Sequence, residues 1–580
     1  MVYNMKGFII MKKNRQGIEK SSLVDRRKFI AGSAIASLAA INSEVLAGSK
    51  LISSDSNPVF SDSEAKNVVV VGSGIGGLAA AALLAKEGHH VTVLEANDRI
   101  GGQGRTKQFN GLNFSMGPQY CWFFGEGEIG DRFLKRIGIE NSSPFVQMPE
   151  QGFETIFLGE NKKDSKVQVY AIPMGMGRFK QYMVDLFPQD HKLGAWFEYM
   201  EKAFAEISAL TTGRKNDRGD QGIFEFLWNL FRENPVKTLK SMRYVSMVFM
   251  SLKDTFDLFA LSPEVRRVLY GHGGIFVENE SVVSAIAYYV ATRNYHGGAS
   301  YPQRGFRVFF EEIKKSIENT GGTVRVNQKV AKLHRVGSKI LAAECTDGSY
   351  YPCDVLVSNI APKLTAGLIA EDRISPQYTY TPGPSIPTLC IGLKPGYPNF
   401  REGLRGRNYW WLDNKGETGY INTNINDRPQ MLFIASSTAR GFGNTAKNHD
   451  DDALTIYFVG NYQQEAEIHN QGSEAYDRMK RRLTDQVLAI VNDHVLPGIL
   501  DYIKFTALTT SVDTVKEIGT EQGNAYGKRM NVREMISSVS FPDDGYDNLY
   551  NVSSTAKSAG IASGIGSGAE LLRILTGKRM

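Results

Sequence analysis

The sequence predicts an α/β fold in which a Rossmann-like domain is combined with a mixed α+β cap domain. Near the N-terminus, four consecutive valines lead into a glycine-rich turn and an alanine-rich helix, as in a parallel strand that is buried on both faces. The chain then alternates helical and strand patterns and ends in a second run of small residues. Roughly 530 residues follow the N-terminal leader, which is enough for two domains.

The segment 67–102 begins with a strand and a G-x-G-x-x-G turn. Gly72 permits the tight turn, Gly74 lets the backbone approach a pyrophosphate, and Gly77 lets the following helix pack close to the strand. Glycine-rich turns between a strand and a helix also occur for purely structural reasons. The turn by itself is therefore weak evidence for a nucleotide.

The elements after the turn strengthen the interpretation. A helix is predicted over 75–86, and its free N-terminal N–H groups and dipole favour a phosphate. Gly88 ends the helix, and a second strand closes on Glu95, 23 positions after Gly72. A carboxylate at that position can accept hydrogen bonds from both ribose hydroxyls. The complete order of elements favours a bound dinucleotide.

The N-terminal leader has the features of a twin-arginine export signal. Arg26 and Arg27 precede a short, mildly apolar run that ends in small residues at Ala47. The run contains too many polar residues for a stable membrane span. A frayed basic helix is the alternative interpretation. Because the twin-arginine route carries folded proteins, the signal predicts a periplasmic protein that meets the twin-arginine translocase after loading its cofactor in the cytoplasm.

The net charge of +6 comes mostly from this leader. Residues 1–47 hold eight Lys or Arg and three acidic residues, so the remainder has a net charge of about +1. This balance argues against nucleic-acid binding. The four cysteines, Cys121, Cys345, Cys353 and Cys390, show no C-x-x-C pair and no metal-ligand spacing. Cys345 and Cys353 can pair across two strands or remain buried free thiols.

Two hairpins and a helical region are predicted after the dinucleotide unit. Short strands surround a turn at Asn110-Gly111, and residues 153–173 resemble a hairpin with a charged tip. Residues 174–295 are mainly helical by their i, i+3, i+4 apolar spacing. Within them, the Met- and Phe-rich segment 239–261 is most often plain core. The alternatives are the wall of an apolar substrate tunnel and a peripheral contact with a membrane.

The C-terminal half alternates helices and strands. Helices are predicted over 306–319 and 472–497, and short β runs occupy 385–470. A final helix is predicted from Gly568 to Thr576.

Several motifs together resemble the superfamily of flavin-containing amine oxidases and phytoene desaturases. The resemblance covers roughly residues 65–580 and is closest to the branch of carotenoid desaturases, carotenoid isomerases and retinol saturases. The matching motifs are Glu95-Ala-Asn-Asp-Arg99-Ile-Gly101-Gly102 with Arg105-Thr106, Phe114-x-x-Gly117-Pro118, Tyr301-Pro302-x-x-Gly305, Asn327-x-x-Val330, Ser358-Asn359-x-x-Pro362, and the C-terminal run from Gly560 to Gly568.

The resemblance implies FAD as the cofactor, bound by a discontinuous domain. The implied cofactor-binding residues are Gly72, Gly74, Gly76, Gly77, Glu95, Arg99, Gly101, Gly102, Arg105, Thr106, Gly117, Pro118, Val330, Ser554, Gly560 and Ile561. The implied domains are a signal peptide (1–47), a linker (48–64), three parts of the FAD-binding domain (65–150, 300–375 and 541–580), and two parts of the substrate or cap domain (151–299 and 376–540).

The chain departs from the family pattern at three places. Ser115 stands where the family has a carboxylate in F-D-x-G-P, and Ser553-Ser554 stand where it has Gly followed by an acid. Gln103 replaces the arginine that follows the glycine pair, and Arg105 is a candidate substitute. A serine at 554 gives up a charge-assisted hydrogen bond of about 1.5–3 kcal/mol. The flavin end of the site is therefore less well defined than the adenosine end.

The function predicted from these observations is that of an exported FAD-dependent oxidoreductase. It would transfer hydride to or from a lipophilic, polyene or isoprenoid-like substrate in desaturation, saturation or isomerisation, with an electron acceptor that the sequence does not name. No histidine is predicted to be catalytic, and no metal is expected. One alternative is an amine or amino-acid oxidase, with Tyr409, Trp410 and Trp411 as local candidates for an aromatic clamp. The other is a flavin-binding protein that has lost its activity.

Overall fold

The computed structural model describes most of the chain beyond the leader. The predicted signal peptide, and all of the linker except its last residue, lie outside the described residues. So do residues 212–245 and 272–277 of the predicted helical region, which include the first part of the Met- and Phe-rich segment 239–261. The described residues are 64–211, 246–271, 278–369, 380–414, 424–440, 451–531, 543, 545–557 and 559–580.

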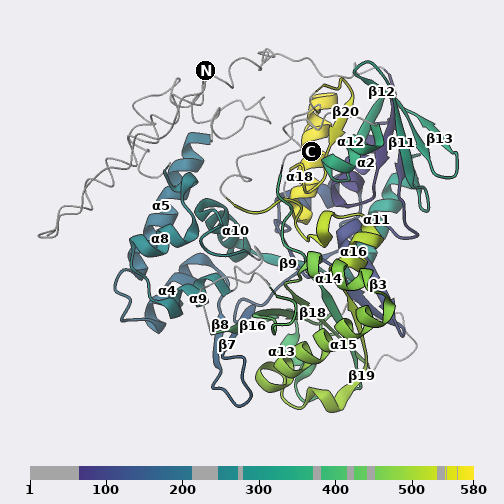
Figure 1. Ribbon diagram of the computed structural model, residues 1–580. Helices are drawn as coiled ribbons and strands as arrows, with labels where there is room; N and C mark the ends of the chain where they lie inside the picture. Colours follow the sequence, from purple (N-terminus) through teal and green to yellow (C-terminus); the bar gives the residue numbers. More distant parts are fainter. Residues whose placement is uncertain are drawn as a thin grey trace, which may run out of the picture. The chain divides into compact units, whose positions relative to one another are not determined.

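Strands and helices alternate along the described residues (Figure 1). The strands are β1 (Asn67–Val71), β2 (His90–Leu94), β3 (Thr106–Phe109), β4 (Leu112–Ser115), β5 (Cys121–Trp122), β6 (Phe145–Gln147), β7 (Glu154–Gly159), β8 (Gln168–Ile172), β9 (Ala299–Pro302), β10 (Thr323–Arg325), β11 (Val330–Val336), β12 (Lys339–Cys345), β13 (Tyr350–Pro352), β14 (Val355–Ser358), β15 (Thr388–Leu393), β16 (Asn408–Asp413), β17 (Met431–Ala435), β18 (Asp452–Phe458), β19 (Ile503–Thr509) and β20 (Leu549–Asn551). The helices are α2 (Ile75–Lys86), α3 (Ile129–Ile137), α4 (Met176–Leu186), α5 (Leu193–Thr211), α8 (Leu252–Leu258), α9 (Pro263–Gly271), α10 (Ala285–Gly297), α11 (Gly305–Asn319), α12 (Pro362–Ile369), α13 (Phe400–Leu404), α14 (Tyr462–Asn470), α15 (Ser473–Ile490), α16 (Ser511–Ile518) and α18 (Ile561–Thr576).

A parallel sheet gathers strands from three distant parts of the chain. Its order is β10-β2-β1-β14-β20, and every neighbouring pair in it is parallel. The predicted α/β class is therefore confirmed, and the helix predicted over 75–86 is α2. The sheet contains strands from each predicted part of the FAD-binding domain, while the domain boundaries themselves stay predictions.

The two faces of this sheet belong to different cores because side chains alternate along a strand. Val68 and Val70 of β1 pack in the core that contains α2 and α18. Val69 and Val71 pack on the opposite face, together with Leu333 of the small antiparallel sheet β11-β12-β13. A run of valines without alternation thus reflects a strand that is covered on both sides.

Glycines allow α18 to lie directly against α2, side by side in Figure 1. A Cβ at Gly564 would lie 2.5 Å from the Ile75 side chain, and one at Gly568 would lie 2.7 Å from the backbone nitrogen of Ala80. The predicted start of the last helix at Gly568 is wrong, because α18 begins at Ile561. The small residues predicted to precede the helix are its packing face.

A second, seven-stranded sheet combines the hairpin β7–β8 with the later strands. Its order is β19-β15-β18-β17-β16-β7-β8, with β16 and β7 parallel and the other pairs antiparallel. One face packs on α15, which continues as a π-helical turn over Val491–Val495. The opposite face carries Trp410, Phe433 and Tyr457 into the core shared with the first sheet.

The predicted hairpins at 153–173 and around Asn110-Gly111 are both present. Asn110 and Gly111 have φ values of 47° and 83°. Positive φ at both central residues is the requirement of a type I′ turn, which matches the twist of the strands that it joins. The Asn110-Gly111 pair therefore predicts the hairpin because both residues can adopt the positive φ values that this turn requires.

The cysteines are free and buried in the structure. The N–H of Cys353 donates to the Leu341 carbonyl at 2.9 Å, four positions along β12 from Cys345. Four residues of a strand span about 13 Å, beyond the Cα separation of about 7 Å that a disulfide tolerates. Burial raises the pKa of Cys353 to about 12. Of the two arrangements considered for Cys345 and Cys353, the structure has free thiols.

The predicted helical region contains α4, α5, α8, α9 and α10. Ser251 begins α8 with a capping box, in which its side chain accepts from Asp254 N–H and the Asp254 carboxylate accepts from Ser251 N–H. Among the helices that the structure describes, none combines the length and the apolar character needed to cross a bilayer.

The contact between α2 and α18 yields a matched pair of substitutions. Gly568→Ala places a methyl group against the α2 backbone and should lower the free energy of unfolding by about 1–3 kcal/mol. Gly566→Ala, in the same helix, meets only Ile129 at 3.6 Å and should raise the free energy of unfolding by about 0.5–1 kcal/mol. Urea unfolding of both variants measures the difference. Equal midpoints would contradict the packing role of Gly568.

Candidate functional site

The glycine turn lies at the carboxyl edge of the parallel sheet. Gly72 has φ +93°, a left-handed conformation that glycine adopts without strain, and its N–H donates to the Leu94 carbonyl at 2.8 Å. This bond joins the ends of β1 and β2, so the turn and the residue that follows β2 lie next to each other. Ligands of open α/β sheets bind at this edge.

Asn359 covers the glycine turn from the neighbouring strand. It follows β14, and its N–H donates to the Val71 carbonyl at 2.8 Å. A Cβ added at Gly74 would collide with the Asn359 amide, and one at Gly76 would collide with the Val552 carbonyl. Gly77 is confined in the same way by the Gly72 carbonyl. The protein's own close packing therefore already requires glycine at these positions. At Gly74 the predicted reason was the approach of a pyrophosphate, and the structure adds the contact with Asn359.

Two helix N-termini meet at this turn. α2 begins after Gly74 and α18 after Gly560, and neither N-cap residue supplies a side-chain hydrogen bond. A Cβ at Gly564, in the first turn of α18, would lie 3.1 Å from the Gly76 nitrogen. Uncapped N–H groups and two positive dipole ends favour an anion. Ile561, the first residue of α18, is buried beside them.

Glu95 is fixed by its neighbours at the end of β2. One carboxylate oxygen accepts from Ser73 N–H at 3.0 Å and from the Ser73 hydroxyl, and the other accepts from the Asn97 backbone and side-chain amides at 2.9 and 3.0 Å. Gly101 N–H donates to the Ser73 carbonyl at 3.0 Å. The carboxylate is thus oriented before a ligand binds, and a ribose hydroxyl would share it with Ser73 or Asn97.

A positively charged cluster lies beyond the glycine pair. Arg105 donates to Glu517 at 2.6 Å, and Lys107 also contacts this carboxylate. Two cations around one anion leave a net positive charge. The Arg105 backbone N–H donates to the Gly102 carbonyl at 3.2 Å, and a Cβ at Gly102 would lie 3.3 Å from the Gly74 Cα. The Arg105 Nε is buried and has no hydrogen-bond partner among the described residues. Such an orphaned donor fits a phosphate oxygen.

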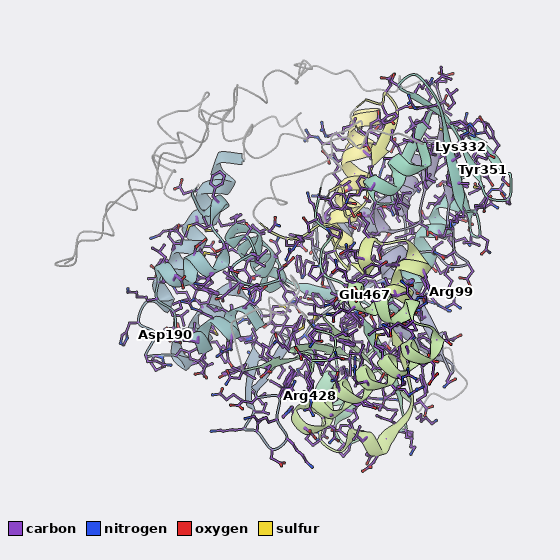
Figure 2. The ribbon with its side chains drawn as sticks, viewed as in Figure 1. Arg99, Asp190, Lys332, Tyr351, Arg428 and Glu467 are labelled. Carbon is purple, nitrogen blue, oxygen red and sulfur yellow. The ribbon has the colours of Figure 1, made fainter. Side chains whose placement is uncertain are left out.

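The remaining predicted residues divide between the site and the surface. Arg99 is exposed, pairs with Asp98 at 3.6 Å and is labelled at the surface in Figure 2. Thr106 begins β3, and Val330 begins β11 with its side chain in the core beneath the parallel sheet. Ser554 lies half-buried in the turn after β20.

The serines that depart from the family pattern make local contacts. The Ser115 hydroxyl donates to the Pro118 carbonyl at 2.7 Å and so closes the turn at Gly117. The Ser553 hydroxyl accepts from Ala556 N–H at 3.3 Å. Gln103 donates to the Asn524 carbonyl at 2.5 Å. These three residues stabilise the segments around the site through bonds to the protein backbone.

Sequence reasoning missed a buried polar network beside Gly117 and Pro118. Arg440 donates to the Gln119 carbonyl at 3.0 Å, to the Gln119 side-chain oxygen at 3.1 Å, and to the Asn408 side-chain oxygen. The Asn408 amide in turn donates to Glu154. Glu154 is the single charged residue in the otherwise mostly apolar pattern of β7, a signal that could have identified it. Arg440 lies in the turn after β17 and carries no such signal.

Aromatic side chains surround this network. We call Tyr120, Tyr295, Trp410, Phe433 and Tyr457 the aromatic cluster. Tyr120 stacks on Tyr295 at 4.6 Å, Trp410 meets Phe433 edge-on at 4.6 Å, and Phe433 lies 5.7 Å from Tyr457. The Tyr457 hydroxyl donates to the Ser115 carbonyl at 2.6 Å. The cluster therefore borders the Gly117-Pro118 turn.

Burial dominates the electrostatics of the network. Glu154 has no exposed surface, and desolvation raises the pKa of its carboxyl well above its usual range. Hydrogen bonds from Asn408 and Trp410, and the charge of Arg440, offset only part of this pKa shift. Burial also lowers the pKa of Arg440 to about 10, so its guanidinium stays charged at neutral pH.

The proposed aromatic clamp of an amine oxidase is not formed by neighbours on β16. Trp410 and Trp411 point to opposite faces of the strand: Trp410 packs in the aromatic cluster, whereas Trp411 packs in the core beneath α15 and stacks on His494 at 5.8 Å. Tyr409 lies on the same face as Trp411 and packs against the same core. Trp410 therefore cannot enclose one amine together with either of its two neighbours.

The chain matches a sequence model of the family described as flavin containing amine oxidoreductase over residues 75–380. It belongs to this family. A model described as pyridine nucleotide-disulphide oxidoreductase also matches residues 29–111, which include the glycine turn. The predicted superfamily is confirmed, and the chain is a FAD-dependent oxidoreductase.

Members of the family that resemble this chain include two named enzymes. The chain is 23% identical to all-trans-retinol 13,14-reductase of Danio rerio over 505 residues, 80% of this chain and 77% of the relative. It is 23% identical to phytoene desaturase (neurosporene-forming) of Rhodobacter capsulatus over 545 residues, 86% and 92% of the two chains. A solved oxidoreductase from Methanosarcina mazei shares the fold, with a TM-score of 0.56, 17% identity and coverage of 86% and 99%.

The residues of the site fit FAD. The uncapped N-termini of α2 and α18 and the Arg105 guanidinium suit the diphosphate, and Glu95 suits the adenosine ribose. The individual contacts to the cofactor stay predictions, because they rest on the resemblance and on this fit.

Asn359 allows the two roles of Gly74 to be separated. Gly74→Ala alone should lower stability, because its methyl group collides with the Asn359 amide. In an Asn359→Ala background the collision is absent, so the second substitution should cost no further stability. It should still weaken FAD retention at least tenfold, about 1.4 kcal/mol, if the diphosphate lies over the turn. Urea unfolding of the apoprotein and flavin absorbance per protein chain measure the two effects. Full FAD retention in the double variant would contradict the predicted cofactor position.

Proposed function

We propose that this flavoenzyme transfers hydride between FAD and a carbon–carbon bond of a lipophilic polyene or isoprenoid-like substrate. The observation that carries the proposal is the aromatic cluster beside the Gly117-Pro118 turn, because closely packed rings offer an apolar surface for a flat, conjugated chain. The names of the relatives add support, since one acts on all-trans-retinol and another on phytoene.

Protein groups in such a reaction mainly orient the substrate and exclude water, while FAD, when bound, supplies the two-electron chemistry. Phe433 and Trp410, both on the inner face of the seven-stranded sheet, form one wall of an apolar environment. Tyr120 and Tyr295 form the facing pair. Because these rings are buried, bulk water would be kept away from the reacting carbons.

The proposal is tested with the FAD-loaded chain. Reduced with dithionite under anaerobic conditions, it should be reoxidised by all-trans-retinol or by a carotene, with a matching loss of polyene absorbance. The same chain stripped of FAD is the control. On a panel of amines the oxidised protein should release no peroxide. Peroxide release from amines without any reaction of polyenes would favour the amine oxidase function instead.

We also propose that the chain is exported to the periplasm by the twin-arginine route, on the basis of Arg26 and Arg27. Replacing both residues by lysine should retain the FAD-loaded protein in the cytoplasm, as seen by fractionation and immunoblotting. Lys12→Arg with Lys13→Arg is the matched control, because it conserves charge outside the arginine pair. Unchanged export of the double-lysine variant would refute the proposal.

A further inference from the structure

Glu154 is a buried carboxyl inside an apolar region. It begins β7 and has no exposed surface, and its two hydrogen-bond partners are Asn408 and Trp410. Among the described residues, it is the one carboxyl hydrogen-bonded to a member of the aromatic cluster. A charge in such a place is costly unless it is paired, so the group favours its neutral form.

The two hydrogen-bond partners of the Glu154 carboxyl among the described residues, Asn408 and Trp410, are both donors. Arg440 can only donate, so its bond to Asn408 fixes the amide oxygen toward Arg440. The Asn408 amide nitrogen then donates to Glu154 and, at 3.0 Å, to the Tyr295 hydroxyl. The Trp410 indole N–H is also a donor only. Because both partners donate to the carboxyl, the proton of the acid cannot bond to either of them. The proton is thus held by neither partner of the acid, and the Trp410 ring that donates to the carboxyl belongs to the aromatic cluster.

The network connects this acid to the predicted flavin region. Arg440 bonds to Gln119, one position after Pro118, and the Gln119 amide donates to the Tyr457 hydroxyl at 2.7 Å. Tyr457 itself contacts the carbonyls of Ser115 and Gly117. A substrate lying along the aromatic cluster would thus have the Gly117-Pro118 turn on one side and Glu154 on the other.

We propose that Glu154 is the proton donor in the reduction of a conjugated double bond, which assigns this chain to saturation rather than desaturation. In this step one alkene carbon gains hydride from the reduced flavin, and the π-electron pair forms a new C–H bond to the Glu154 proton at the other carbon. The flavin is oxidised, the substrate is reduced by two electrons, and the carboxylate regains its proton from solvent when the product leaves. The inference rests on the proposed function and adds its direction.

The test compares Glu154→Gln with a matched variant. In single-turnover mixing of the dithionite-reduced, FAD-loaded chain with all-trans-retinol, Glu154→Gln should slow flavin reoxidation about 100-fold or more, the usual contribution of a general acid. Glu465→Gln is the control: Glu465 is equally buried with a raised pKa, but it bonds to Ser511 outside the aromatic cluster. It should react at the wild-type rate. Equal rates for wild type and Glu154→Gln would overturn the inference.

Two readouts separate proton donation from a structural role. The wild-type rate should fall as pH rises through the Glu154 pKa, because the donor is lost, whereas the rate of Glu154→Gln should be independent of pH in that range. Glu154→Asp, which keeps an acid, should recover part of the rate. A Glu154→Gln variant with the same pH profile as wild type would refute the role.

A substrate-free measurement covers the case in which no polyene reacts. The infrared difference spectrum of wild type minus Glu154→Gln at neutral pH should contain the carbonyl stretch of a protonated carboxylic acid. An ionised Glu154 would overturn the inference whatever the substrate. A protonated Glu154 in a wild-type chain that reduces no polyene would overturn the proposed function and, with it, the proton donation to a double bond.

Discussion

The close packing of α18 against α2 is the contact on which the rest of the structure depends. Gly564 and Gly568 bring the backbones together, and the two uncapped helix N-termini thereby reach the same edge of the parallel sheet. Asn359 and Val552 close over the glycine turn from the adjacent strands. A binding site for an anionic cofactor then results from backbone geometry, with Glu95 and Arg105 supplying the charged groups at its ends.

The second sheet contributes its chemistry through a small number of buried polar groups. Burying Glu154 and Arg440 is costly, and hydrogen bonds through Asn408 and Gln119 offset much of that cost. The network also connects strands that are distant in the chain and holds the rings of the aromatic cluster at the Gly117 turn. The aromatic rings of this region, next to the buried Glu154, are the basis of the proposed reaction on a hydrocarbon chain.

The residues that depart from the family pattern bond to the protein's own backbone. Ser115 closes the turn at Pro118, and Gln103 bonds to Asn524. The lost carboxylate and arginine would have been charged contacts, whereas these residues act on the protein backbone. Positive charge near the glycine pair comes instead from Arg105 and Lys107, which share Glu517 on α16.

The sequence by itself determined the features that depend on local geometry: the βαβ unit from Asn67 to Glu95, the type I′ turn at Asn110-Gly111, the hairpin β7–β8, and the left-handed glycine at position 72. Their signals are periodicity and allowed φ values, which neighbouring residues suffice to specify. Only the tertiary structure decided that Asn359 occupies the space above Gly74, that α18 starts at Ile561, and that Glu154 lies among aromatic rings. Those outcomes depend on contacts between residues hundreds of positions apart, which local sequence patterns do not encode.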